Sequence, residues 1–150
     1  LLGHKDEEVV RLTAELIPLI TDMPEGAVRP LSEALASPNS NVRAAAAEGL
    51  ALAGPKAAPA ARPLADAIAK SYPAQFDPMT YLAGGPEAAY WKALGRVGAP
   101  AVAPVAKLLE HTNVMVKMLA ARTLGEVGEP ARAAKDALKK TLAEPTIDVA

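Results

Sequence analysis

The chain has 150 residues, a formal net charge of −1 and no cysteine. Its acidic and basic residues are interspersed, which disfavours a nucleic-acid partner, because nucleic acids select a basic stripe. The lack of cysteine excludes disulfides and thiolate metal sites, and no apolar run reaches the roughly 20 residues that a membrane-spanning helix needs. Hydrophobic residues make up 51% of the chain and aromatic residues only 3%, which predicts closely packed helices with an aliphatic core.

One spacing recurs four times along the chain. An apolar anchor is followed by Leu or Ile after eight residues, by a helix-stop position after twelve and by Leu after twenty-two. The anchors are Val9, Val42, Pro86 and Val116. Recurrence at a period of about 30–45 residues is typical of helical repeat arrays and predicts a single all-α domain of four units. The expected bounds of the units are about residues 9–36, 42–69, 86–111 and 116–143.

Each unit is expected to consist of two helices joined by a short turn. In the second unit, Asn39, Ser40 and Asn41 are N-cap candidates for the first helix. That helix is expected to end at Ala53, because Gly54 stands where a left-handed residue closes many helices and a proline follows it. Glycine and proline recur at the corresponding positions of the third and fourth units. The second helices are expected at about residues 27–36, 58–70, 102–111 and 132–143.

An insert at about residues 70–85 lengthens the interval between the second and third units. The anchors Val42 and Pro86 are 44 residues apart, whereas the other two intervals are 33 and 30 residues. All five aromatic residues of the chain fall within residues 72–91. Aromatic and methionine side chains are enriched at the centres of interfaces, so the insert is a candidate for contact with a protein partner. The side chains concerned are Tyr72, Phe76, Met79 and Tyr81.

The alternative is that the insert packs into the gap between the two units. Tyr90 and Trp91 occupy repeat positions that hold alanine pairs in the second and fourth units. Their rings are therefore expected to be buried inside the array. Both interpretations of the insert remain open at this stage.

Both ends of the chain continue the repeat pattern. Residues 1–9 match residues 108–116, and residues 142–149 match residues 35–42. Helical arrays normally end in units with a polar outer face, and neither end shows that pattern. The units are therefore expected to be part of a longer array, or to be covered at their ends by a partner.

Residues 41–50 and 116–128 resemble HEAT repeats of the short bacterial type, also called the phycobilisome-lyase type. The pattern begins with Asn or Asp and Val-Arg, continues with pairs of small residues and ends with Leu-Gly-x-apolar-Gly. The third unit has Pro86-Glu87 in place of Val-Arg, and the first unit lacks both glycines. The resemblance implies a right-handed α-α superhelix, with the first helices on its convex side and the second helices on its concave side.

The resemblance also implies a class of function. Most members of this family are scaffolds that bind protein partners, and a minority act as, or within, lyases that attach bilin chromophores to proteins. The shared residues are packing positions, so they specify the fold better than the function.

The repeat phase places charged residues on the expected concave face. Eight and twelve residues after the helix-stop positions, the chain carries Arg29, Glu33, Arg62, Asp66 and Glu110. The spacing i,i+4 allows ion pairs along the helices, including Asp136 with Lys140, and stacking would set neighbouring units side by side. These side chains are predicted to bind a protein partner. The alternative is a solvated helix face with weak surface pairs.

Catalysis has little support in the sequence. His4 and His111 occupy equivalent turn positions, and the chain has no His-x-x-x-His spacing, Gly-rich phosphate loop or nucleophile motif. No catalytic residue, metal ligand or cofactor is therefore assigned. The predicted function is a non-enzymatic scaffold for a protein partner. The alternative is a subunit or domain of a chromophore lyase or a similar modifying enzyme.

Overall fold

A computed structural model of the protein describes residues 25–72 and 86–143. Every element in these two stretches is helical, as the repeat spacing predicts, and no helix there is long and apolar enough to cross a membrane. The elements in chain order are η2 (Glu25–Ala27), α2 (Val28–Ala34), α3 (Ser40–Ala53), η3 (Gly54–Ala60), α4 (Ala61–Ser71), α6 (Pro86–Val97), η4 (Ala99–Ala101), α7 (Val102–Leu108), α8 (Val114–Val127), η5 (Glu129–Ala134) and α9 (Lys135–Ala143). The expected first helix of the first unit lies outside the described residues.

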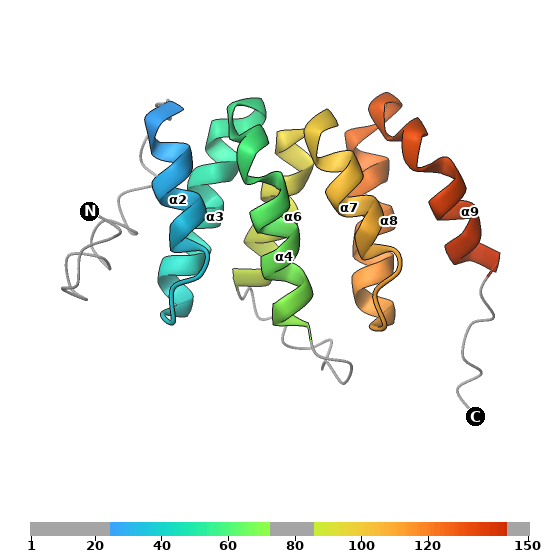
Figure 1. Cartoon of the computed structure of the whole chain (residues 1–150), viewed down its shortest axis with the longest axis horizontal. Helices are drawn as coiled ribbons and strands as arrows, with labels where there is room; N and C mark the ends of the chain where they lie inside the picture. Colours follow the sequence, from blue (N-terminus) through green and yellow to red (C-terminus); the bar gives the residue numbers. More distant parts are fainter. Residues whose placement is uncertain (1–24, 73–85, 144–150) are drawn as a thin grey trace.

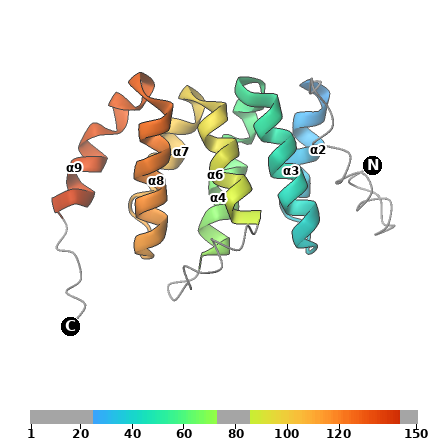
Figure 2. The same ribbon diagram turned by 180° about the vertical axis from the view of Figure 1, so that it is seen from behind.

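The helices form two layers (Figures 1 and 2). α2, α4 and α7 lie in one layer, and α3, α6 and α8 lie in the other. α9 follows at the end of the row. This arrangement agrees with the expectation that the second helices of the units share one face and the first helices share the other. We name the two layers the second-helix layer and the first-helix layer.

Asparagine side chains start the first helices of the second and fourth units. Asn39 precedes α3, and its side chain accepts a hydrogen bond from the Asn41 backbone N–H at 3.0 Å. Asn113 precedes α8 and accepts one from the Met115 N–H at 2.9 Å. Both caps have an extended backbone, which lets the side chain fold over the first turn. The first of the three N-cap candidates in the sequence is therefore the cap.

Glycines end α3, α6 and α8, as predicted, but in an unexpected conformation. Gly54, Gly98 and Gly128 have φ values of 55°, 77° and 76° with ψ values of −129°, −135° and −134°. This is the mirror image of extended backbone, not the left-handed helical conformation that closes many helices. Any side chain would be strained there, so glycine is needed where the chain turns from one layer to the other.

The second helices begin later than predicted in two units. α4 begins at Ala61 and α9 at Lys135, each three residues after its expected start, because η3 and η5 occupy the intervening residues. Each of these 3-10 segments has a proline at its first positions, where the missing N–H favours a short turn before the α-helix. α7 ends at Leu108 instead of His111, because the next three N–H groups bond to carbonyls three residues back.

The repeated leucines lie in the core, as their spacing predicts. They pack with many buried alanines, whose small side chains let the helices approach closely. The buried repeat leucines are Leu31, Leu50, Leu64, Leu94, Leu108 and Leu124. Leu138 of α9 is only partly buried, in keeping with its place at the end of the row.

Three aromatic residues are described, and all are buried. Tyr72, Tyr90 and Trp91 are 1%, 0% and 4% exposed. Their burial confirms the prediction for Tyr90 and Trp91. The interpretation of Tyr72 as a partner contact is wrong, because its ring fills the core at the end of α4 and its Oη accepts a hydrogen bond from Trp91 Nε1 at 3.2 Å. The other proposed contacts of the insert, Phe76, Met79 and Tyr81, lie outside the described residues.

Candidate protein-binding grooves

Two of the predicted ion pairs lie on the second-helix layer. Arg29 Nε is 3.1 Å from Glu33 Oε1 on α2, and Arg62 Nε is 3.9 Å from Asp66 Oδ2 on α4. All four side chains are 62–89% exposed. Exposed pairs of this kind stabilise a protein by at most about 1 kcal/mol. A partner can therefore engage these side chains at little cost to the fold.

A third ion pair connects two neighbouring units. Glu110 follows α7, and its Oε1 lies 3.9 Å from Lys140 Nζ on α9. The spacing predicts that Lys140 pairs with Asp136 on its own helix, whereas the pair in the structure crosses from one unit to the next. Stacking of the units thus brings their charged residues side by side, as the repeat phase predicts.

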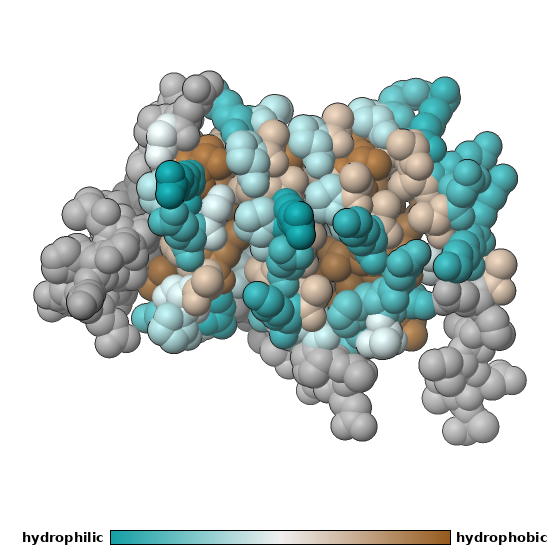
Figure 3. Space-filling view, in the orientation of Figure 1, coloured by the Kyte–Doolittle hydropathy of each residue, from teal (hydrophilic) through white to brown (hydrophobic). Residues whose placement is uncertain are grey.

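A groove of about 490 Å³ lies between α4 and α7 in the second-helix layer. Its apolar lining consists of Ala65, Ala69, Ala103, Pro104 and Leu108. Its polar lining consists of Arg62, Asp66, Lys107, Glu110 and His111. Three of the predicted contact residues therefore line one groove, which we name the α4/α7 groove. Figure 3 shows this face of the molecule, with hydrophilic side chains standing over apolar surface.

His111 holds the turn between α7 and α8, as predicted for a turn residue. Its Nδ1 accepts a hydrogen bond from the Asn113 backbone N–H at 3.0 Å. Within residues 25–72 and 86–143, no group of three or more His, Asp or Glu residues is arranged to hold a metal ion. The groove is thus lined by packing residues, surface charges and one turn histidine.

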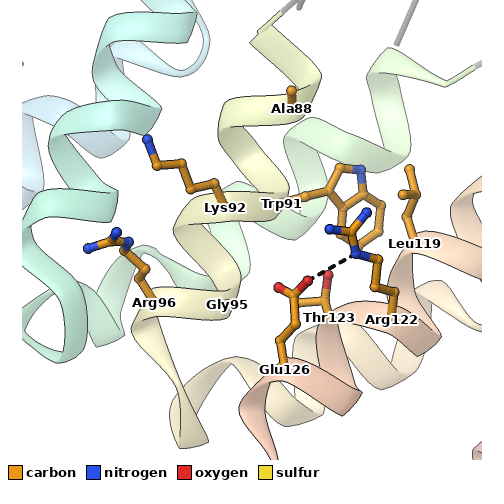
Figure 4. Close-up of a pocket in the computed structure, with 9 residues that line it drawn as sticks. All are labelled: Ala88, Trp91, Lys92, Gly95, Arg96, Leu119, Arg122, Thr123 and Glu126. Carbon is orange, nitrogen blue, oxygen red and sulfur yellow. Dashed lines mark hydrogen bonds and ion pairs between the residues drawn. The ribbon is translucent and has the colours of Figure 1, made fainter. Parts of the chain in front are cut away.

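A second groove, of about 380 Å³, lies between α6 and α8 in the first-helix layer (Figure 4). Its lining residues are Ala88, Trp91, Lys92, Gly95, Arg96, Leu119, Arg122, Thr123 and Glu126. We name it the α6/α8 groove. Figure 4 shows Trp91 directed from α6 toward α8, and Lys92 and Arg96 directed toward α3. The repeat spacing does not predict this groove. The signal for it in the sequence is a pair of cations, Lys92 and Arg96, spaced i,i+4 on an exposed helix face.

Ion pairs engage two of the three cations in the α6/α8 groove. Lys92 Nζ lies 2.7 Å from Glu48 Oε2 on α3, and Arg122 Nε lies 3.0 Å from Glu126 Oε1 on its own helix. Arg96 is exposed and has no ion pair within the described part of the chain. The charged ends of Lys92 and Arg96 are thus directed away from α8, and the cation on the α8 side of the groove, Arg122, is paired with Glu126.

Residues 87–150 match the family model of HEAT repeats. The match covers the last two helix pairs, α6 with α7 and α8 with α9, and it includes every lining residue of the α6/α8 groove. Among curated proteins, none matches the chain. The match supports the resemblance to HEAT repeats that the sequence pattern indicates in these units.

The arginine of the HEAT-like Val-Arg pattern has a structural role in the second unit. Arg43 Nη1 donates hydrogen bonds to Ser37 O at 2.8 Å and to Pro38 O at 2.9 Å. Both carbonyls belong to the turn after α2, so Arg43 ties the first unit to the second. Packing between HEAT-like units therefore accounts for this residue without a ligand.

Tyr90 is a buried polar residue outside both grooves. Its Oη makes no hydrogen bond among the described residues, although Arg43 and Ser71 lie near it without reaching hydrogen-bond geometry. Burial raises the pKa of the Tyr90 hydroxyl, and the Arg43 guanidinium opposes part of this effect. Tyr90 thus bears on the stability of the HEAT-like array and not on either groove.

Proposed function

We propose that the protein is a non-enzymatic scaffold that binds a protein partner through its second-helix layer. HEAT repeats generally mediate protein–protein interactions, and the match to residues 87–150 supports this role. The proposed contacts on this layer are the five charged residues that the repeat phase singles out, Arg29, Glu33, Arg62, Asp66 and Glu110.

The proposal rests on the α4/α7 groove. Three alanines and a proline contribute to its lining, so a partner chain can approach the helices closely. Arg62 and Lys107 supply positive charge, and Asp66 and Glu110 supply negative charge. The occupant that fits is a segment of a partner protein with one small or apolar face and charges of both signs. Mixed charges of this kind set the orientation of a segment more than its affinity.

Replacement of Ala103 by tryptophan tests this placement. Ala103 is exposed at the groove, so a larger ring would occupy the space without disturbing the core. A partner isolated with the wild-type protein by affinity purification should bind Ala103→Trp at least about tenfold more weakly in isothermal titration calorimetry. The matched control is Ala133→Trp, at an exposed alanine of η5, which should bind like the wild type. Equal binding by the two variants would contradict the groove as the site, and failure to isolate any direct partner would contradict the scaffold function.

The proposal includes two finer features of the prediction. The insert side chains Phe76, Met79 and Tyr81 are proposed to add contacts to the partner. The repeat units are proposed to form four helix pairs in a right-handed superhelix. Because Tyr72 is buried, the insert is tested by replacing only residues 73–81 with a short Gly/Ser turn. A partner that binds this variant with unchanged affinity would remove the insert from the interface and leave the second-helix layer as the binding surface.

A further inference from the structure

We propose that His111 is a partner-binding residue of the α4/α7 groove, where its Nε2–H donates a hydrogen bond to a backbone carbonyl oxygen of the bound protein segment. The inference rests on the proposed function, because it concerns the same groove, and it adds a residue that selects an uncharged acceptor. The support comes from the turn after α7, from the second nitrogen of the ring and from the balance of charge in the groove.

The turn after α7 uses one of the two nitrogens of the His111 ring. Nδ1 accepts a hydrogen bond from the Asn113 backbone N–H at 3.0 Å, and Asn113 is only 6% exposed. A backbone N–H can only donate, so Nδ1 carries no proton and the proton of the neutral ring lies on Nε2. The hydrogen bond thus fixes the tautomer and holds the ring against the turn.

The turn itself does not require a histidine. Ser37 lies five residues before the anchor Val42, as His111 lies five residues before Val116. In the turn after α2, Ser37 Oγ accepts a hydrogen bond from the Asn39 N–H at 3.2 Å. A hydroxyl therefore does for one turn what Nδ1 does for the other. The rest of the imidazole ring is not needed for the turn, and His111 lines the α4/α7 groove.

Nε2 of His111 can be reached by a ligand. The hydrogen bond through Nδ1 is the only one that the His111 side chain makes to a described residue. Tyr90 Oη is the single buried side-chain nitrogen or oxygen without a partner in the described part of the chain, so Nε2 is in contact with solvent. An oxygen of a partner can replace water there. A metal ion fits less well, since it would displace the proton to Nδ1, against the Asn113 N–H.

The charges of the groove favour an uncharged acceptor. Two cations, Arg62 and Lys107, and two carboxylates, Asp66 and Glu110, line it. The lining is neutral in sum, so it offers no net positive charge that would select an acidic side chain. The alanines of the lining let the backbone of a partner approach the helices closely. A backbone carbonyl oxygen therefore matches the neutral imidazole N–H better than a carboxylate does.

Peptides selected for the groove serve as the probe. A library of random ten-residue peptides displayed on phage is depleted on Ala103→Trp, in which the new ring occupies the groove, and is then selected on the wild-type protein. A synthetic copy of an enriched peptide should bind His111→Ser about threefold to tenfold more weakly than the wild type, because one neutral hydrogen bond is lost. Equal binding by His111→Ser and the wild type would overturn the proposal and leave the groove as the site. Failure to enrich any peptide would contradict the groove itself, and with it the proposed function.

Two variants at position 111 separate the turn from the groove. His111→Ser keeps an acceptor for the Asn113 N–H, as Ser37 does for Asn39, so its thermal midpoint should stay within about 2 °C of the wild type. His111→Ala removes that acceptor and should melt about 3–5 °C lower. Both variants should bind the peptide equally weakly. Weak binding by His111→Ala alone would show that the ring acts only through the turn, which would contradict the proposal.

Nuclear magnetic resonance and a modified peptide identify the donor and the acceptor. The ring nitrogen shifts of His111, assigned by their loss in His111→Ser, should be those of the Nε2–H tautomer. Addition of the peptide should change the Nε2 shift more than the Nδ1 shift. Replacement of every aspartate and glutamate of the peptide by asparagine and glutamine should leave the effect of His111→Ser unchanged. A proton on Nδ1, or loss of that effect in the modified peptide, would contradict the assignment of Nε2–H to a carbonyl oxygen.

Discussion

The two contacts that α6 makes within the first-helix layer differ, although both belong to the same repeat. On one side, α6 packs closely on α3, which is rich in buried small residues such as Ala46, Ala47 and Gly49. On the other side, Trp91 stands between α6 and α8 and a groove remains. The difference teaches that a large residue at a repeat position that holds alanine elsewhere accompanies a less extensive contact between units, since α6 packs much less on α8 than on α3.

The insert and the groove are connected through one hydrogen bond. Tyr72 lies at the point where the chain leaves α4 toward the insert, and its Oη receives the Trp91 N–H. Trp91, which lines the α6/α8 groove, is therefore held by the residue that follows α4.

Among the variants that test the difference between the two sides of α6, removal of the Trp91 ring should have the largest effect on stability. Trp91→Ala is expected to lower the free energy of unfolding by about 3–5 kcal/mol, because it deletes a buried ring and leaves a cavity. Urea denaturation measures this loss. Trp91→Phe retains most of the ring but loses the N–H to Tyr72, and should cost less. A loss below about 1 kcal/mol for Trp91→Ala would mean that α6 and α8 close onto each other as α3 and α6 do.

A larger side chain on the packed side of α6 should destabilise the contact between α3 and α6. Ala47 is fully buried on α3 at the repeat position of Trp91, so Ala47→Leu is expected to cost about 1–3 kcal/mol through overpacking. Ala121 stands at the same repeat position on α8 and is only partly buried. Ala121→Leu is the matched control and should change stability by less than about 0.5 kcal/mol in the same denaturation experiment. Equal costs at the two positions would show that the contacts are equally tight.

Much of the fold follows from local sequence signals. The cap at Asn39 and the stop at Gly54 bound α3 as predicted, because each acts on its own helix end. The starts of α4 and α9 could not be predicted, since a proline-led segment can continue as 3-10 or α-helix and the choice depends on packing. The ψ values of the glycines are likewise set by the path between the layers.

The grooves could be predicted from the sequence only where the repeat phase suffices to place their residues. Arg62, Asp66 and Glu110 follow from the phase, and the structure brings them to one groove. The α6/α8 groove depends on the separation of two helices, which is a tertiary property that the spacing does not contain. Trp91 signals it only in retrospect, because a large residue at a small position can equally be packed with no space left.

The two buried tyrosines should respond in opposite directions to loss of the hydroxyl. Tyr72→Phe is expected to cost about 1 kcal/mol, because it leaves the Trp91 N–H without its partner. Tyr90→Phe should be neutral or stabilising by up to about 1 kcal/mol, because the hydroxyl it removes is buried without a hydrogen bond. Urea denaturation at pH 7 measures both variants. A clear loss for Tyr90→Phe would show that Arg43 or Ser71 bonds to this hydroxyl in solution.

The stability of the wild type should also depend on pH through Tyr90. Burial raises the pKa of this hydroxyl in the folded state, whereas a tyrosine in the unfolded chain ionises near pH 10. Below about pH 10 both states are protonated and Tyr90 has no effect on the pH dependence. Above it, the unfolded state loses its proton first, so stability falls as the pH rises toward the folded pKa. The stability of Tyr90→Phe relative to the wild type should therefore increase between pH 9 and pH 11. Parallel curves of stability against pH for the two proteins would contradict the raised pKa.

The smallest expected effects concern the ion pairs on the two sides of α6, toward α3 and toward α8. Lys92–Glu48 crosses from α6 to α3, with side chains 50% and 33% exposed, whereas Arg122–Glu126 stays within α8 and is 68% and 51% exposed. Double-mutant cycles with glutamine should give a coupling energy of about 0.5–1 kcal/mol for the first pair and about 0.3–0.5 kcal/mol for the second. The difference should shrink at high salt, since both pairs are reached by solvent. A larger coupling for Arg122–Glu126 would mean that the open side of α6 holds its charges more firmly than the packed side.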